Sequence, residues 1–202
     1  MINIHNLSIA YGSHLVIDDL SFSLDQGSDI IILGHHGAGK TSLLNWIFGL
    51  VKGSGKMMVD QLEISHPSPK KLLKNGMCLV PEQGCVFSDL TVRENILFSK
   101  SLVNNNELIQ TNEGLWKSLS HLMDAKAYSL SGGQTRILSI LMGLVRNPKY
   151  IFLDEPFAGL AKDTINLFLN EIEILKERNV GVLITGEFDK IEYSKFTNIL
   201  EL

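Results

Sequence analysis

A glycine-rich segment that ends in a lysine has the composition of a phosphate-binding loop. It reads Gly34-His-His-Gly-Ala-Gly-Lys40-Thr41, and it stands between an apolar stretch over residues 29–33 and a helical pattern over residues 40–50. Glycines let successive backbone N–H groups turn toward phosphate oxygens, because no Cβ stands in the way, and the positive end of the helix dipole adds attraction. We expect Lys40 to reach the β- and γ-phosphates of a nucleotide and the Thr41 hydroxyl to hold Mg²⁺. The alternative is a glycine-rich turn that binds no ligand.

The whole loop is expected to contact the phosphates, chiefly through its backbone. His35 and His36 fill variable positions, and their imidazoles are assigned no chemistry of their own. The expected nucleotide-contacting residues of this segment are Gly34, His35, His36, Gly37, Ala38, Gly39, Lys40, Thr41 and Ser42.

Two adjacent carboxylates follow an apolar run far downstream of the loop. The run covers residues 150–153, and Asp154, Glu155 and Pro156 come directly after it. Ligands of open α/β sheets bind outside the carboxyl ends of the strands, so these acids are expected to face the nucleotide. We expect Asp154 to take Mg²⁺ through water and Glu155 to polarise the attacking water. The alternative is a plain turn that leaves the sheet, since Pro156 offers no ladder donor.

A third motif, Leu130-Ser-Gly-Gly-Gln134, precedes a helical run over residues 137–145. Ser131 is a favourable N-cap, and the N–H groups of the first turn, starting from Gly132 and Gly133, could bind a phosphate. Read alone, the motif is more often a simple helix cap.

The rest of the chain must supply the elements that position these residues. Residues 2–10 and 20–24 alternate between apolar and polar and predict strands of a half-buried sheet. Short apolar runs typical of buried parallel strands lie at 29–33, 57–60, 77–80, 150–153, 181–185 and 198–202. A helix is expected over 163–178, with a core-facing stripe of Ile165, Leu167, Phe168, Leu169, Ile172 and Leu175. These patterns predict an α/β fold with a mostly parallel sheet.

One segment departs from this alternation of strands and helices. Residues 92–127 carry helical spacing around a polar loop at Asn104-Asn105-Asn106, and we interpret them as a small helical subdomain. The expected organisation is one domain over residues 1–202, with a core made of 1–91 and 128–202. This length suits a single domain with a substantial core.

Composition narrows the class of protein. Of the 202 residues 45% are apolar and 20% are charged, and the formal net charge is −4, so no basic surface suggests a nucleic-acid partner. No apolar run is long enough to span a bilayer, and the N-terminus lacks the features of a signal peptide. Cys78 and Cys85 fit no metal-binding spacing, and we expect them to be reduced in the cytosol.

The three motifs, in this order and spacing, closely resemble those of ATP-binding cassette (ABC) transporter ATPase subunits over nearly the whole chain. The resemblance implies a P-loop NTPase core, an N-terminal antiparallel β subdomain and the inserted helical subdomain. It implies that two cassettes dimerise head to tail, so that the γ-phosphate lies between one phosphate loop and the other subunit's Ser131, Gly132, Gly133 and Gln134. It further implies an aromatic ring stacked on adenine, at Tyr11, for which the alternative is an ordinary core or surface tyrosine.

The same resemblance implies ATP and Mg²⁺ as ligands and two protein partners. These are a second cassette, identical or different, and a transmembrane permease, with the chain peripheral on the cytoplasmic face of the inner (plasma) membrane. Val80-Pro81-Glu82 and the segment 86–95 resemble the branched-chain amino-acid (Liv-type) branch, while 147–159 also resembles ATPases that drive lipopolysaccharide export. In such proteins the corresponding segment lines the groove that receives the permease, so the resemblance implies this role for Glu82 and Phe87–Leu90. The alternative is a plain surface loop.

The chain departs from the family pattern at three places. Glu187 stands where most relatives place a histidine that contacts the γ-phosphate, Met142 replaces a common arginine, and the usual C-terminal extension is absent. A carboxylate near the γ-phosphate repels it unless it is protonated or a cation intervenes. One hypothesis is therefore a slow site in an asymmetric heterodimer. The opposing hypothesis keeps hydrolysis, because Glu155 is intact. A non-transport ABC protein or a nucleotide-binding regulatory module is the remaining alternative.

Overall fold

Two β-sheets organise the fold in the computed structural model, which describes residues 1–83, 85–102, 113–187 and 195–202. The larger sheet has five parallel strands in the order β6-β7-β8-β3-β9. These strands are β3 (Asp29–Leu33), β6 (Met77–Val80), β7 (Tyr150–Leu153), β8 (Gly181–Gly186) and β9 (Asn198–Glu201). Each runs parallel to its neighbours, so their carboxyl ends share one edge. The predicted parallel sheet is confirmed.

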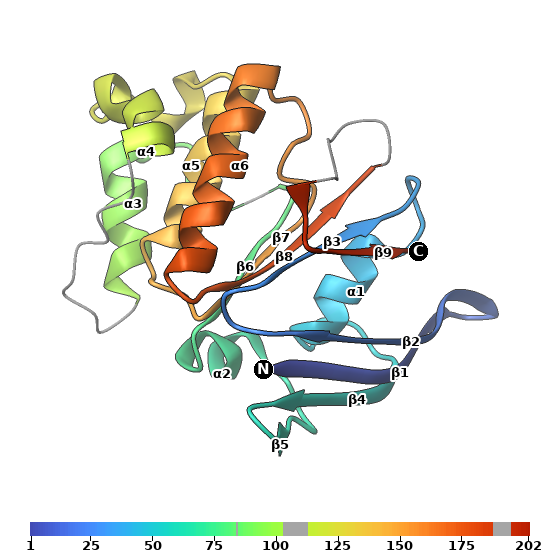
Figure 1. The fold of residues 1–202 in the computed structure, drawn as a ribbon. Helices are drawn as coiled ribbons and strands as arrows, with labels where there is room; N and C mark the ends of the chain where they lie inside the picture. The colour runs from blue at the N-terminus through green and yellow to red at the C-terminus, as the bar shows by residue number, and fades with distance from the viewer. Residues whose placement is uncertain (84, 103–112, 188–194) are drawn as a thin grey trace.

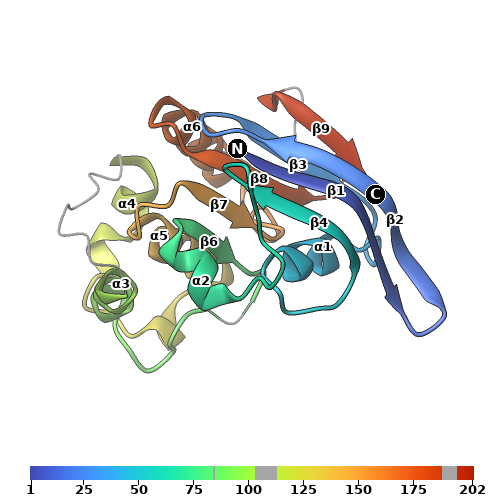
Figure 2. The same ribbon diagram turned by 90° about the horizontal axis from the view of Figure 1, so that it is seen from below.

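The smaller sheet is antiparallel and has the order β2-β1-β4-β5. It consists of β1 (Ile2–Tyr11), β2 (His14–Leu24), β4 (Ser54–Val59) and β5 (Leu62–Glu63). The hairpin of β1 and β2 projects beyond the body of the molecule at its tip (Figure 2). The antiparallel N-terminal part, expected from the family resemblance, is therefore present.

Helices cover both faces of the parallel sheet. Helix α1 (Lys40–Ile47) lies between the two sheets, whereas α3, α4, α5 and α6 cover the opposite face (Figure 1). The helices of that face are α3 (Val92–Ser101), α4 (Glu113–Leu119), α5 (Gly132–Leu144) and α6 (Lys162–Glu177), and a short α2 (Pro69–Lys74) precedes β6. Two 3-10 turns, η1 (Ser120–Leu122) and η2 (Ala127–Ser129), connect α4 to α5.

Alternate side chains of each parallel strand enter different hydrophobic clusters, as the period of two requires. Ile31 and Leu33 pack with the helices α3–α6, while Ile30 and Ile32 pack with α1 and the antiparallel sheet. Both clusters are nearly inaccessible to solvent, which explains why these strands read as continuous apolar runs. Among the described residues no helix combines the length and the apolar character needed to cross a bilayer.

Several predicted boundaries were wrong. Strand β2 begins at His14, not at residue 20, because the turn at Gly12 (φ +62°) pairs Tyr11 with His14 and continues the hairpin through a stretch without alternation. Helix α1 ends at Ile47, before Gly49 (φ +70°). The run at 57–60, expected to be a parallel strand, belongs to β4 (Ser54–Val59), which pairs antiparallel with β1 in the smaller sheet. Leu167 was wrongly assigned to the core stripe of α6: it is 39% exposed, because the run Leu167-Phe168-Leu169 covers more of the helix circumference than the core can take. The predicted loop at Asn104-Asn105-Asn106 lies outside the described residues.

Candidate functional site

The glycine-rich segment forms a tight loop between the end of β3 and the start of α1. Gly37 and Gly39 adopt φ angles of +85° and +103°, a region that side chains with a Cβ rarely enter. A Cβ on Gly39 would also lie 2.7 Å from Cγ1 of Val16, so the loop could not keep its present position against β2. These constraints explain the glycines without reference to a ligand, and they leave the loop backbone curled at a helix N-terminus, where an anion is favoured.

Lys40 is buried beneath this loop and uses all of its donors within the chain. Its ammonium donates to the carbonyl oxygens of Gly34 (2.6 Å) and His35 (3.0 Å), and it forms an ion pair with Oε1 of Glu155 at 3.0 Å. The side chains of Lys40 and Glu155 are only 7% and 16% exposed, so this pair is screened little by water. The carboxylate of Glu155 therefore provides the negative charge that a phosphate would otherwise supply to Lys40.

Asp154 is held by two threonine hydroxyls that come from different elements. Thr41 at the start of α1 donates to Oδ2 at 2.9 Å, and Thr185 near the end of β8 donates to Oδ1 at 2.7 Å. A hydroxyl and a carboxylate at this separation are hard oxygen donors of the kind Mg²⁺ prefers, so the residues present fit that ion. The sequence analysis did not select Thr185; its only signal was a hydroxyl in an otherwise apolar strand.

Glu155 has a strained backbone. Its φ angle of +47° lies in the left-handed region, which for a residue with a Cβ costs about 1–2 kcal/mol. The Glu155 N–H donates to Oγ1 of Thr185 at 2.9 Å, so the same hydroxyl holds Asp154 and the peptide after it. Strain of this kind persists only where surrounding contacts determine the conformation, and it is common at functional sites.

A cavity of about 350 Å³ opens beside the loop. The tip of the β1–β2 hairpin forms one wall, with Tyr11, His14 and Val16, and the loop itself forms the other, with Glu82 and Glu155 at the margin. Tyr11 is 51% exposed, and its hydroxyl lies 3.1 Å from Oγ of Ser42. The structure thus brings Tyr11 to the edge of the loop cavity, together with His14 and Val16, which the sequence analysis did not select.

The Ser131 motif begins helix α5, as its sequence predicted. Ser131 is the N-cap, its hydroxyl accepts from the Gln134 N–H at 3.3 Å, and the Gln134 side chain accepts from the Ser131 N–H at 2.9 Å. This reciprocal capping box occupies the Gln134 side chain. Gly132 and Gly133 line a second cavity, of about 470 Å³, which Glu82 and Glu155 border from the other side. The motif and Lys40 therefore line different cavities.

Glu187 follows the end of β8, beside the start of the phosphate loop. Gly186 pairs with Leu33 in the parallel ladder, and its carbonyl accepts from the Gly34 N–H at 3.2 Å. Glu187 therefore directly follows a residue that is hydrogen-bonded to the start of the loop.

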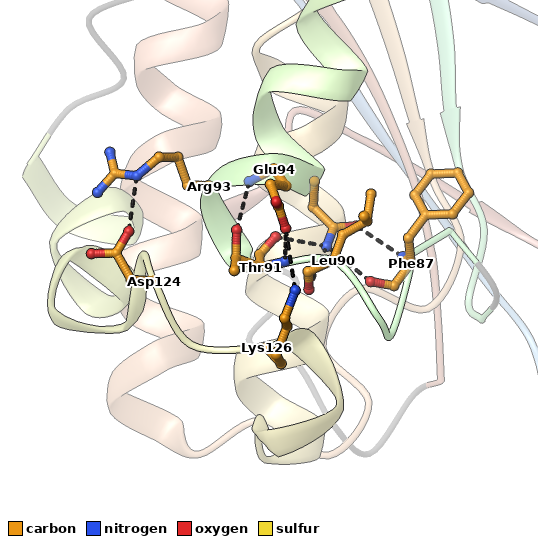
Figure 3. A network of polar contacts seen from close by, with 8 residues as sticks. Phe87, Leu90, Thr91, Arg93, Glu94, Asp124 and Lys126 are labelled. Carbon is orange, nitrogen blue, oxygen red and sulfur yellow. Dashed lines mark hydrogen bonds and ion pairs between the residues drawn. The ribbon is translucent and has the colours of Figure 1, made fainter.

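The segment after β6 is fastened to the helical part of the molecule. Asn95, which is fully buried, accepts from the Phe87 N–H at 2.8 Å and donates to the carbonyl oxygens of Phe87 (3.0 Å) and Thr91 (2.9 Å). Thr91 and Glu94 form a capping box at the start of α3, next to the ion pair of Arg93 with Asp124 (Figure 3). Hydrogen bonds from Thr91 hold the pKa of Glu94 below its ordinary value.

Exposed apolar side chains form a surface on this segment and on α3. The rings of Phe87 and Phe98 meet edge to face at a centroid distance of 4.9 Å, and both rings are more than two-fifths exposed. Leu97 and Leu102 are exposed on the same helix or at its end. Phe87, Phe98 and Leu102 border a cavity of about 240 Å³ that Cys78, Cys85 and Arg146 also line. Burial raises the pKa of the Cys78 thiol to about 11, so this cysteine stays protonated and unreactive.

Known proteins share both the sequence and the fold. A family model described as ABC transporter matches residues 17–158, which include all three motifs. The lipopolysaccharide export system ATP-binding protein LptB of Haemophilus influenzae is 33% identical over 186 residues, covering 89% of this chain and 77% of LptB. The probable branched-chain amino acid transport ATP-binding protein LivG of Methanocaldococcus jannaschii is 29% identical over 197 residues, with the same coverage. A solved ATP-binding cassette of an ABC transporter in its ADP conformation is 27% identical, with a TM-score of 0.83 over all of this chain and 86% of that one.

Proposed function

This chain belongs to the ABC transporter family as an ATP-binding cassette, and from that premise we propose that it hydrolyses ATP with Mg²⁺ inside a dimer of cassettes that powers a membrane permease. The observation that carries the proposal is the separation of Lys40 from Gly132 and Gly133, which line different cavities. One chain alone offers a triphosphate only half of a binding site. A second cassette, facing head to tail, supplies the missing N-terminus of α5.

The residues around the loop divide the chemistry among them. Lys40 and the loop N–H groups hold the β- and γ-phosphates, while Thr41 and Asp154 hold Mg²⁺, which offsets negative charge when it is bound. Arrival of the phosphates competes with Glu155 for Lys40 and so frees the carboxylate. Glu155 then accepts a proton from water as the water oxygen bonds to the γ-phosphorus and the bond to the bridging oxygen of ADP breaks, which gives ADP and phosphate.

The apolar surface around Phe87 and Phe98 is the proposed contact with the permease. It lies on the helical part of the chain, and its cavity shares Cys85 with the cavity at Gly132. Glu82 borders that second cavity and the loop cavity. An apolar helix of the permease, placed on the cytoplasmic side of the membrane, would bury exposed aromatic surface here. Closure of the dimer would thereby reach the permease through the segment that carries Glu82.

Phe98→Asp tests this surface. Burying a phenylalanine stabilises a contact by about 1.5–3 kcal/mol, so a charged replacement should lower the amount of permease that co-purifies at least tenfold, given about 1.4 kcal/mol per factor of ten. Nucleotide affinity of the isolated chain should stay unchanged. Leu62→Asp, at an exposed apolar residue of β5, is the matched control. Equal recovery of the permease with both variants would place the contact elsewhere.

A second candidate function is that of the catalytically weak subunit in an asymmetric pair of cassettes. The position of Glu187 beside the Gly186–Gly34 hydrogen bond favours it, because a carboxylate there opposes the γ-phosphate. Glu155 would then act slowly at this chain's own site, while the α5 N-terminus still completes the site of the partner cassette.

Glu187→His separates the two candidates. A slow site predicts that the substitution raises phosphate release by roughly tenfold, since it removes a repulsion of about 1 kcal/mol or more at short range. Glu187→Gln removes the charge without adding an imidazole and should recover part of the gain. No increase with either variant removes the slow-site candidate and leaves Glu187 as a residue that tunes an active site.

A nucleotide-binding regulatory module would behave differently from both. It would dimerise with ATP but release no phosphate, and it would purify without an integral membrane protein. A non-transport ABC protein would instead purify with ribosomes or DNA, which the net charge of −4 disfavours.

A further inference from the structure

Arg136, in the second turn of α5, lines the cavity at Gly132 and makes one of the densest sets of polar contacts in the described part of the chain. We propose that Arg136 is a positioning residue for hydrolysis: it holds the carbonyl groups of Asp154 and Pro156, the residues on either side of Glu155, so that the carboxylate stays aimed at the phosphate site. The inference rests on the proposed function, because it assigns Glu155 the role of proton acceptor.

The guanidinium joins the ends of two neighbouring strands. Its Nη1 donates to the carbonyl oxygens of Pro81 (2.7 Å) and Glu82 (2.8 Å), just beyond β6. Its Nη2 donates to the carbonyl of Asp154 and its Nε to that of Pro156 (3.4 Å), just beyond β7. The ladder between these strands ends where the Asp154 N–H donates to the Val80 carbonyl at 3.0 Å. Arg136 therefore joins the two strand ends beyond the point where backbone pairing stops.

The contacts to β7 enclose Glu155. The carbonyl groups of the two flanking residues, Asp154 and Pro156, are both bound by one rigid guanidinium, while the N–H of Glu155 is bound by Thr185. The left-handed φ of +47° would relax if these peptides were free. The strained backbone is thus determined by Arg136 from the α5 side and by Thr185 from the β8 side.

Because Arg136 is buried, water cannot replace its hydrogen bonds to the four carbonyl groups. Arg136 is 7% exposed, and its burial lowers its pKa, an effect that nearby Cys85, Asp154, Glu82 and Glu155 oppose. The group stays protonated at neutral pH because the ordinary pKa of arginine is so high. A planar fork with five N–H donors can serve four carbonyls spread over two strand ends, whereas the three donors of a lysine ammonium diverge from one point.

The test compares Arg136→Lys and Arg136→Gln with the wild-type complex. We expect kcat for phosphate release to fall roughly tenfold with lysine and a hundredfold with glutamine, while the ATP affinity of the isolated chain changes less than twofold, because the phosphate loop is not touched. Arg93→Gln, which removes an exposed arginine of α3, is the charge-matched control and should leave kcat unchanged. Melting curves identify any variant that fails to fold. If the glutamine variant does not fold, the lysine variant alone is compared with the wild type.

Amide hydrogen exchange supplies a readout that does not need turnover. The Glu155 N–H donates to Thr185, and the Ala158 N–H donates to the Glu155 carbonyl. Loss of Arg136 should free the backbone around Glu155, weaken both hydrogen bonds and speed the exchange of these two N–H groups at least tenfold. If the wild-type complex releases no phosphate, the proposed function fails, and exchange alone then decides whether Arg136 holds these peptides. Unchanged exchange at these amides, or a loss of kcat that only follows a loss of ATP affinity, would overturn the inference.

Discussion

Glu155→Gln is expected to lower phosphate release by roughly 10²–10⁴-fold while ATP still binds, and to leave the cassettes dimeric as long as ATP is present. Glutamine keeps the shape of the side chain but cannot take a proton from water. The substitution also removes the ion pair with Lys40, whose ammonium lies 3.0 Å from the carboxylate in the structure. Lys40 becomes fully available to phosphate, so nucleotide affinity should not fall.

The measurement is phosphate release by the assembled complex, with ATP binding to the isolated chain measured beside it. Glu173→Gln makes the same chemical change at an exposed acid of α6 and should be neutral. Unchanged turnover in the Glu155 variant would show that another group accepts the proton. A parallel loss of binding and turnover would show instead that Glu155 supports the fold of the loop.

Ser131→Arg should be nearly as severe, for a different reason. Ser131 caps α5, and a bulky cation at this position would obstruct the helix N-terminus that we assign to the nucleotide of the partner cassette. We expect turnover to fall at least a hundredfold, while the affinity of the isolated chain for ATP stays within twofold. That combination is the mark of a residue that acts across the dimer, because Ser131 does not line its own chain's loop cavity.

Loss of the cap has a modest effect of its own, about 1 kcal/mol of stability, which a melting curve would detect. Ser120→Arg introduces the same charge at an exposed serine of η1, away from both cavities, and should leave turnover intact. If Ser131→Arg weakened ATP binding to the isolated chain as much as turnover, the site would be complete within one chain.

The sequence predicted the elements that carry the site better than the contacts within it. Strands β3, β6 and β7 lie where their apolar runs placed them, because a strand covered on both faces must be apolar throughout. The turn from β3 into α1 was equally clear, since its glycines are fixed by backbone geometry. Strand β2 was recognised only in part, because residues 14–19 belong to a hairpin whose faces do not alternate simply.

Contacts to the backbone leave no such pattern. Arg136 binds carbonyl groups, which every residue has, so nothing in the identities of Pro81, Glu82 or Pro156 marks them as its partners. Thr185 resembles any polar residue at a strand end until its hydroxyl is seen between Asp154 and Glu155. The ion pair of Lys40 with Glu155 depends on the strand order, which brings β7 and β3 to either side of β8.

Tyr11 could be selected from the sequence, whereas the residues that lie beside it could not. The family resemblance located it, and the structure puts it at the edge of the loop cavity, where its hydroxyl meets Ser42. His14 and Val16 share the wall with it because the hairpin turns at Gly12, and that turn became visible only with the strand pairing.

Cysteine crosslinking across the dimer determines whether two cassettes share one nucleotide. The complex would carry His36→Cys in the phosphate loop of one cassette and Ser131→Cys in the facing one, in a background with Glu155→Gln to retain ATP and Cys85→Ser to remove a competing thiol. We expect an intermolecular disulfide that forms with ATP and Mg²⁺ and not with ADP or without nucleotide. Stoichiometric ATP binding with no such crosslink would contradict a nucleotide shared between two cassettes.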